Sequence, residues 1–239
     1  MLNAPARSGL KAAALWIIVE LAIRAGLVLA VVVALLLAGA LDEEWMERTF
    51  IGHAQAWSLW LAAIVLGWLF WRLVRKHGLT PAELGYRLDL RLLLVAIAAG
   101  LALAAVAYGL GVLAERVTPG LAAQAEELRQ YMRWAGPVAM AGLLIANSIL
   151  GPAAEELAWR GYIQHRLVAA WGSRSGLTST ALVFVAKHAM VDQSLIRLPI
   201  LVVLGLALGL LRLRWGTGVS TIAHVTLNAV ATFFALYSD

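Results

Sequence analysis

Residues 92–114 read LLLVAIAAGLALAAVAYGLGVLA, an apolar stretch without a single charged side chain. A helix rises about 1.5 Å per residue, so roughly 20 such residues cross the hydrocarbon core of a bilayer. Six further apolar segments lie on either side of it, at 14–41, 56–74, 136–158, 177–193, 198–214 and 217–236. The sequence therefore predicts an all-α fold, a polytopic transmembrane helix bundle of about seven spans.

The composition of the whole chain agrees with a lipid surrounding. Of its 239 residues 62% are hydrophobic and 14% are charged. Soluble domains contain about 45–50% apolar and about 25% charged residues, so this chain has too much apolar surface for water. The chain has no cysteine, which excludes disulfides, thiolate catalysis and cysteine-ligated metals.

The basic residues between the segments predict an orientation. With a cytoplasmic amino terminus, twelve Lys and Arg residues fall on the cytoplasmic side and five on the other, as the positive-inside rule requires. The basic clusters thus indicate topology rather than nucleic-acid binding, and the compact basic chain suggests a bacterial inner membrane. The cytoplasmic set is Arg7, Lys11, Arg72, Arg75, Lys76, Arg87, Arg91, Arg160, Arg166, Arg174, Arg212 and Arg214; the opposite set is Arg48, Arg116, Arg129, Arg133 and Arg197.

Ionisable side chains within apolar segments are costly, so each is a candidate for function. In the first segment Glu20 and Arg24 lie one turn apart and are predicted to pair. The other candidates all follow residue 150. They are Glu155 and Glu156 with Arg160, Phe184 with His188, His224 with Asn228, and lastly Lys187.

Helical spacing gives these residues different roles. Glu156 and Arg160 are four apart in the favoured ion-pair order, whereas Glu155 projects about 100° away and is predicted to be free to act as a base. His188 shares a helix face with Phe184, and Asn228 shares one with His224. Lys187 points away from His188 and is predicted to snorkel or to pair with an acid.

Depth provides a second indication that these side chains form one site. Glu155, His188 and His224 each lie ten or eleven residues from a cytoplasmic marker at the end of their segment, about 15–17 Å along a helix. This estimate requires that the stretch from Arg160 to Arg166 is helical. Side chains from three helices are therefore expected at one level in the membrane.

Such a set could hydrolyse a peptide bond. A carboxylate and an imidazole can deprotonate a water, and a second histidine with an amide can stabilise an oxyanion. The alternative is a metal site with Glu155, His188 and His224 as ligands, for which zinc is the candidate. The chain has no H-E-x-x-H helix, and we favour the reading without a cofactor.

The three motifs together resemble those of the CPBP intramembrane proteases, the CAAX prenyl protease and bacteriocin-processing (Abi-like) family. E-E-x-x-x-R corresponds to Glu155–Arg160, F-x-x-x-H to Phe184–His188 and H-x-x-x-N to His224–Asn228, within a match over about 140–236. More weakly, residues 78–85, GLTPAELG, resemble the loop that precedes the motifs in that family. The resemblance implies a four-helix catalytic core, placed at 135–239 after amino-terminal helices at 1–134.

By the same resemblance, Glu155 and His188 would activate water, and His224 and Asn228 would stabilise the oxyanion. Glu156, Arg160 and Phe184 would support them. The implied partners are the bilayer and a membrane-anchored or lipidated protein or peptide. Two alternatives belong to other classes: a proton-coupled transporter that uses the buried Glu and His as a relay, and a non-catalytic bacteriocin-immunity protein on the same fold.

Overall fold

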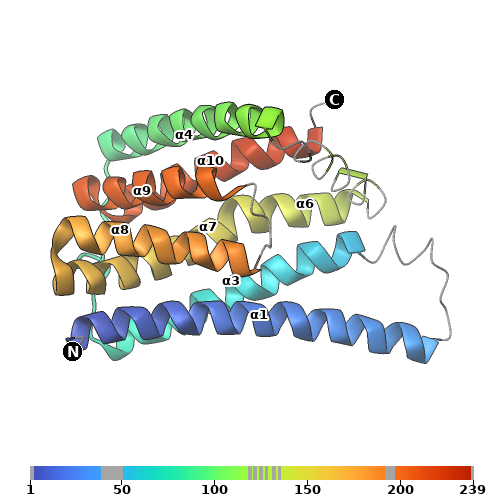
Figure 1. The fold of residues 1–239 in the computed structure, drawn as a ribbon, viewed down its shortest axis with the longest axis horizontal. Coiled ribbons are helices and arrows are strands. Elements are labelled where there is room, and N and C mark those ends of the chain that lie inside the picture. The colour runs from blue at the N-terminus through green and yellow to red at the C-terminus, as the bar shows by residue number, and fades with distance from the viewer. Residues whose placement is uncertain are drawn as a thin grey trace.

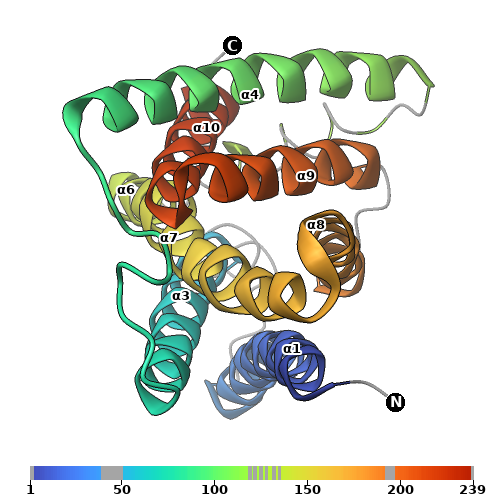
Figure 2. The ribbon, with the colours of Figure 1, turned by 90° about the vertical axis from the view of Figure 1, so that its left-hand side faces the viewer.

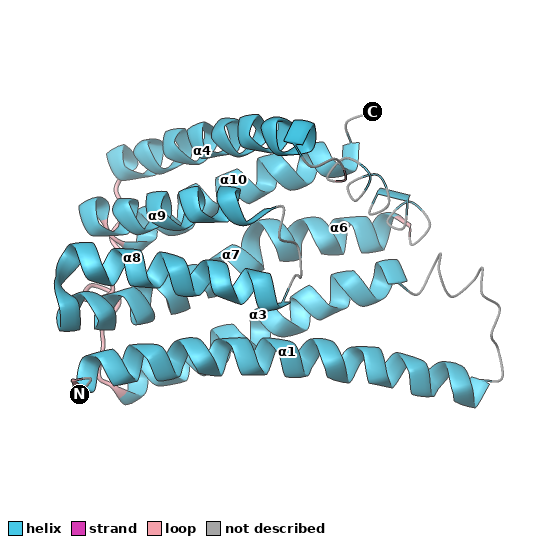
Figure 3. Ribbon diagram, in the orientation of Figure 1, coloured by secondary structure: helices cyan, strands magenta, loops and turns pink. Residues whose placement is uncertain are grey.

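The computed structural model describes residues 3–38, 51–117, 136–191 and 197–237, with isolated positions between 120 and 133. Every regular element in these ranges is a helix, as predicted (Figure 3). Arg48 and the predicted boundary between 134 and 135 lie outside the described residues. The helices are α1 Ala4–Ala38, α3 Ile51–Lys76, α4 Leu90–Val117, α6 Pro137–Ile145, η2 Ala146–Leu150, α7 Gly151–Glu156, η3 Leu157–Gln164, α8 His165–Val191, α9 Leu198–Trp215 and α10 Thr217–Tyr237.

Six helical stretches in the described residues are long and apolar enough to cross a membrane. One of them, Pro137–Val191, has 55 residues, more than twice the roughly 20 of a single crossing. It turns back at Gly172, whose φ of 78° and ψ of 170° are not helical. Counted as two crossings, it brings the bundle to the predicted seven. The chain is thus an integral membrane protein of the predicted class, although the predicted break between 158 and 177 is wrong because the helix continues to the turn at Gly172.

The helices lie side by side along the long axis of the bundle (Figure 1). α4 packs on α10, α1 on α8, and α8 on α9, so the elements that carry the three motifs occupy the middle (Figure 2). The first residues of α1 and the last of α10 lie at opposite ends of the bundle (Figure 1). An odd number of crossings requires that arrangement.

A chain of aromatic side chains fills the core between α1, α3, η3 and α8. The ring centroid of Trp16 lies 5.4 Å from that of Phe70 and 6.2 Å from that of Trp159. The ring centroids of Trp159 and Phe184 are 5.5 Å apart. All four side chains are buried. Offset and edge-to-face ring pairs add stability beyond their buried area. This aromatic cluster therefore stabilises the packing of the helices that carry the motif residues.

The loop between α3 and α4, which contains GLTPAELG, docks on the first turn of α10. Thr217 Oγ1 donates to the carbonyl of Leu84, and the Gly218 amide donates to the carbonyl of Gly85 at 3.1 Å. Gly85 has a φ of +82°, and a Cβ there would lie 2.9 Å from Gly216 Cα. The loop therefore contacts α10 backbone to backbone, at the end of the helix that carries His224.

Gly85→Ala is expected to lower the free energy of unfolding by about 3 kcal/mol, because it combines left-handed strain with a clash against α10. The control is Gly78→Ala, which has a φ of +64° but nothing within 4 Å of an added Cβ. The control should cost only the strain, about 1 kcal/mol. Thermal unfolding in detergent measures both, and equal losses would show that the loop does not dock on α10.

The same loop should respond to acid. Thr80 donates its amide and its hydroxyl to Glu83 Oε2 at 2.7 and 2.8 Å. These bonds lower the pKa of Glu83 from its ordinary value of 4.5. At a pH above 4.5 the ionised carboxylate therefore stabilises the loop. This contribution to stability is lost as the pH falls through the lowered pKa of Glu83. Glu83→Gln should weaken the dependence of the melting temperature on pH below 4.5, and an unchanged dependence would contradict this.

Candidate active site

The helix that carries both glutamates changes its winding on either side of them. The short α-helix α7, Gly151–Glu156, lies between two π-helical stretches, η2 and η3. A π-turn adds a residue to the turn and shifts every side chain that follows, and such turns are frequent at functional sites. Helical continuity from Arg160 to Arg166, which the depth estimate required, is confirmed.

Glu156 is the centre of a buried polar network. Its Oε1 lies 3.1 Å from Arg160 Nη1, the predicted pair, and 3.0 Å from His224 Nδ1, while Oε2 accepts from the hydroxyl of Ser220. Ser220 also contacts the Leu208 carbonyl at 3.1 Å. A carboxylate only accepts, so Nδ1 of His224 carries the hydrogen and Nε2 is left for other contacts.

Glu155 is paired with a cation, contrary to the prediction that it is free. Its Oε1 accepts from Lys187 Nζ at 2.8 Å, and the same Nζ lies 3.3 Å from Glu20 Oε2. Lys187 has only 2% of its side chain exposed, so it pairs with acids and does not snorkel.

Glu20 connects this pair to the first helix. It accepts from Trp16 Nε1 at 2.7 Å and lies 3.3 Å from Arg24 Nη2, so the predicted pairing of Glu20 with Arg24 is confirmed. The amino-terminal helix α1 thus supplies a carboxylate that contacts the partner of Glu155. No motif indicated this contact, since Glu20 and Lys187 lie far apart in the sequence.

Phe184 and His188 face the glutamate helix from α8. The guanidinium of Arg160 lies 4.4 Å from the centroid of the Phe184 ring, and the rings of Phe184 and His188 meet edge to face at 4.6 Å. Phe184 is 2% exposed. It therefore fixes both the cation that holds Glu156 and the imidazole one turn along α8.

Asn228 is anchored to the π-turn that precedes the glutamates. Its Nδ2 donates to the Asn147 carbonyl at 2.9 Å, and Asn147 Nδ2 donates to Thr232 Oγ1 at 2.6 Å. Ser220, His224, Asn228 and Thr232 follow one another at intervals of four along α10. Sequence reasoning missed Ser220, Thr232 and Asn147, although extending the H-x-x-x-N spacing by one turn in each direction would have found the first two.

The structure brings the predicted residues of the three motifs together. Glu155 lies within electrostatic range of Lys187, His188 and His224. The predicted catalytic residues differ from the supporting ones in solvent exposure. Glu155, His188 and Asn228 are partly exposed, and His224 has 8% of its side chain exposed. The supporting side chains are almost fully buried. These are Glu156, Arg160, Phe184 and Lys187.

Two further expectations can be compared with the structure. Arg160 was counted among the cytoplasmic loop charges, but its side chain is 1% exposed and paired, so it says nothing about orientation. For the metal alternative, no three His, Asp or Glu side chains in the described ranges are grouped so that they could hold an ion. The pairing of Glu155 with Lys187 is consistent with that, since a cation already occupies one of its oxygens.

Comparison with known proteins gives one match. Residues 137–230 match the family model of the type II CAAX prenyl endopeptidases, Rce1-like, a range that contains all three motifs. No curated protein and no solved structure matches the chain. The match supports the resemblance to the CPBP intramembrane proteases, since residues 137–230 of this integral membrane protein are similar to the Rce1-like family of type II CAAX prenyl endopeptidases.

Proposed function

We propose that this protein is an intramembrane endopeptidase that hydrolyses a peptide bond in a membrane-anchored or lipidated protein or peptide. The single observation that carries the proposal is the geometry around His224. Glu156 binds its Nδ1, and Glu155 lies within electrostatic range of both His188 and His224. An acid and two imidazoles from three helices thus lie close enough to influence one another electrostatically.

In this proposal Glu155 and His188 activate the water. Lys187 holds Glu155 by Oε1, which leaves Oε2 to accept the proton of a water. The resulting hydroxide attacks the carbonyl carbon of the scissile bond, the C–N bond breaks, and the proton passes to the leaving amine. The partial exposure of Glu155 supports its role because substrate and water must reach it.

His224 and Asn228 would stabilise the negative charge on the carbonyl oxygen. With Nδ1 held by Glu156, the ring presents Nε2, which donates to the oxyanion when it is protonated. One Nδ2 hydrogen of Asn228 bonds to Asn147, and the second hydrogen of the amide is the other donor. Glu156, Arg160 and Phe184 are positioning residues in this scheme.

We propose a reaction that needs no metal. The contact between Lys187 and Glu155 favours it, since an ion bound by Glu155, His188 and His224 would have to displace or repel a buried ammonium group. If zinc were bound there, it would polarise the water or the carbonyl. Activity after stringent chelation distinguishes the two schemes.

The name of the matched family, type II CAAX prenyl endopeptidase, supports a proposal for the substrate class. We propose a prenylated or otherwise lipid-anchored carboxy-terminal segment as substrate. The charge distribution of the sequence supports a bacterial inner membrane with a cytoplasmic amino terminus, which would place the site toward the cytoplasmic leaflet.

The test of the proposed function is reconstitution of the full chain in liposomes with a prenylated CAAX peptide and its unprenylated counterpart. We expect a new carboxy terminus in the prenylated peptide, identified by mass spectrometry, and slower cleavage of the free peptide. If neither peptide is cleaved while the liposomes show proton-coupled flux, the transporter reading replaces this one.

Lys187→Met is expected to lower kcat by about 100-fold with little change in KM, because Glu155 loses the partner that orients it. Lys187→Arg keeps the charge and should retain more activity than the methionine variant. Steady-state cleavage of the prenylated peptide measures both. Equal activity of Lys187→Met and the wild type would show that Lys187 does not position Glu155.

A further inference from the structure

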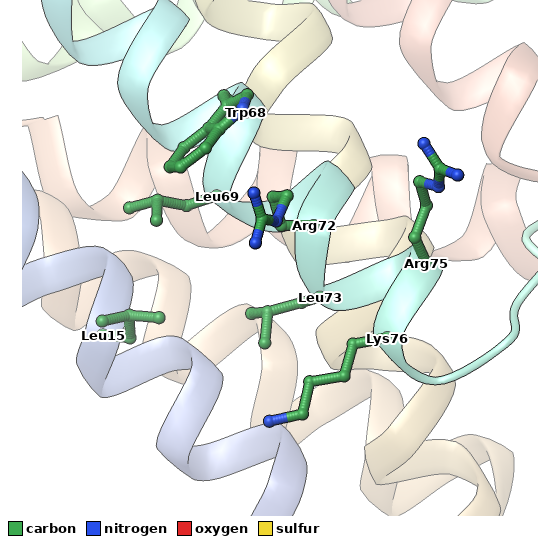
Figure 4. A pocket seen from close by; sticks show the side chains of 7 residues that line it. All are labelled: Leu15, Trp68, Leu69, Arg72, Leu73, Arg75 and Lys76. Atoms are coloured by element: carbon green, nitrogen blue, oxygen red, sulfur yellow. The ribbon is translucent and has the colours of Figure 1, made fainter.

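Two hollows on the surface between α1 and α3 lie apart from the candidate active site. The first, about 650 Å³, is lined by Leu15 of α1 and by six residues of α3 (Figure 4). The second, about 410 Å³, is lined by residues near the start of α1 together with Leu73, His77 and Tyr162. Leu15 and Leu73 line both, so the hollows form one continuous feature, here called the α1–α3 groove.

The charge of the α1–α3 groove is entirely positive. Arg72, Arg75 and Lys76 line the first hollow, Arg7 and Lys11 line the second, and no carboxylate lines either. All five cations are exposed, and none forms an ion pair with an acid of the described chain. A groove of this kind favours a ligand with negative charge.

Part of the lining of the α1–α3 groove is apolar. Leu15, Leu69 and Leu73 lie beside Arg72 and Lys76, and Lys76 reaches from α3 toward α1 (Figure 4). The guanidinium of Arg72 lies 5.2 Å from the centroid of the Trp68 ring, a cation–π contact that fixes its direction. Trp68 itself is 55% exposed, which is typical of an aromatic side chain at the level of lipid headgroups.

Hydroxyl groups complete the second hollow. Ser8 and Tyr162 share a hydrogen bond of 2.9 Å, and the Tyr162 hydroxyl lies 3.2 Å from His77 Nδ1. A phosphate group at this position would meet both cations and hydroxyls. Toward the membrane the apolar face continues along the exposed side of α3, where Ile64 is 57% exposed.

We propose that the α1–α3 groove binds the phosphate headgroup of an anionic phospholipid. The cations bind the phosphate, the leucines contact the glycerol and the first methylenes, and the acyl chains follow α3. Basic pockets between transmembrane helices bind anionic lipid headgroups by this combination of charge and apolar contact. The site is separate from the candidate catalytic residues, so the proposal does not depend on the proposed function.

The test is a titration of the purified full chain in neutral detergent, with thermal unfolding as the readout. The three titrants are phosphatidylglycerol, phosphatidylcholine and inorganic phosphate. The test variant is Arg72→Gln/Lys76→Gln, with Lys11→Gln as an independent single variant from α1. The matched control is Arg87→Gln/Arg91→Gln, which removes two exposed cations at the same end of the bundle but outside the groove.

We expect saturable stabilisation of the wild type by phosphatidylglycerol alone. Its apparent affinity should fall roughly 10- to 30-fold in the groove double variant, less in Lys11→Gln, and not in the control. Three outcomes would overturn the proposal: equal weakening in the control, equal stabilisation by phosphatidylcholine, or stabilisation by inorganic phosphate at the same concentration. The last would identify a soluble anion site instead of a lipid site.

Discussion

Glu155→Gln is expected to lower the rate of cleavage by about 1,000-fold or more. General-base catalysis contributes about 10²–10⁴-fold, and an amide of the same shape cannot take the proton of a water. KM should change little, because the amide fills the same space and leaves the rest of the site in place. Single-turnover cleavage of the prenylated peptide in liposomes measures the chemical step without interference from product release.

The matched control for this prediction is Glu20→Gln. Glu20 also contacts Lys187, but it lies on α1 instead of on the helix that carries the E-E-x-x-x-R motif. If Glu155 acts as the base, Glu20→Gln should cost far less activity than Glu155→Gln. Equal losses would mean that both variants act only through Lys187, and Glu155 would then be a positioning residue.

Arg160→Met is expected to lower the free energy of unfolding by about 3–5 kcal/mol, the largest stability effect anticipated in the chain. The Glu156 carboxylate is fully buried, and Arg160 is 3.1 Å from it. Removing one partner of a buried ion pair leaves the other charge without compensation in a medium of low dielectric constant. Phe184 would also lose its cation–π partner. Unfolding in detergent by heat or denaturant measures the loss.

The double variant Glu156→Gln/Arg160→Met separates charge from packing. If an uncompensated carboxylate causes the loss, the double variant should be more stable than Arg160→Met alone, because no buried charge is then unpaired. The result that contradicts this account is a double variant less stable than either single one. That result would show that packing of the arginine stem, rather than its charge, holds the site together.

The fold was predictable because lipid imposes a simple rule. Each crossing needs about 20 apolar residues, so 92–114 and its counterparts could be recognised by length and hydropathy alone. The helix boundaries between 158 and 177 could not be predicted in this way, because the charge of Arg160 in the sequence is typical of a loop residue. In the structure it is an interior residue whose charge is balanced by Glu156. Only the three-dimensional pairing shows which of these two descriptions applies.

For the candidate site, local spacing was informative and long-range pairing was not. Intervals of four predicted the pairing of Glu156 with Arg160 and placed Phe184 with His188 and His224 with Asn228 on common faces. Helical spacing could not predict the contact between Lys187 and Glu155, because these residues lie 32 positions apart in the sequence. Helical spacing also could not show that π-helical stretches flank α7 on both sides.

The central claim is that Glu155, His188 and His224 surround one space, and the absence of cysteine from the chain allows a direct measurement of it. Cysteine pairs at 155 with 188 and at 155 with 224 should be linked by short bifunctional thiol reagents in intact membranes, as peptide mapping by mass spectrometry would show. A control pair joins 155 with 182, where Leu182 lies on the same helix as His188 and is 58% exposed. We predict links in the two site pairs and none in the control. Linking of 155 with 182 but with neither histidine position would contradict the account.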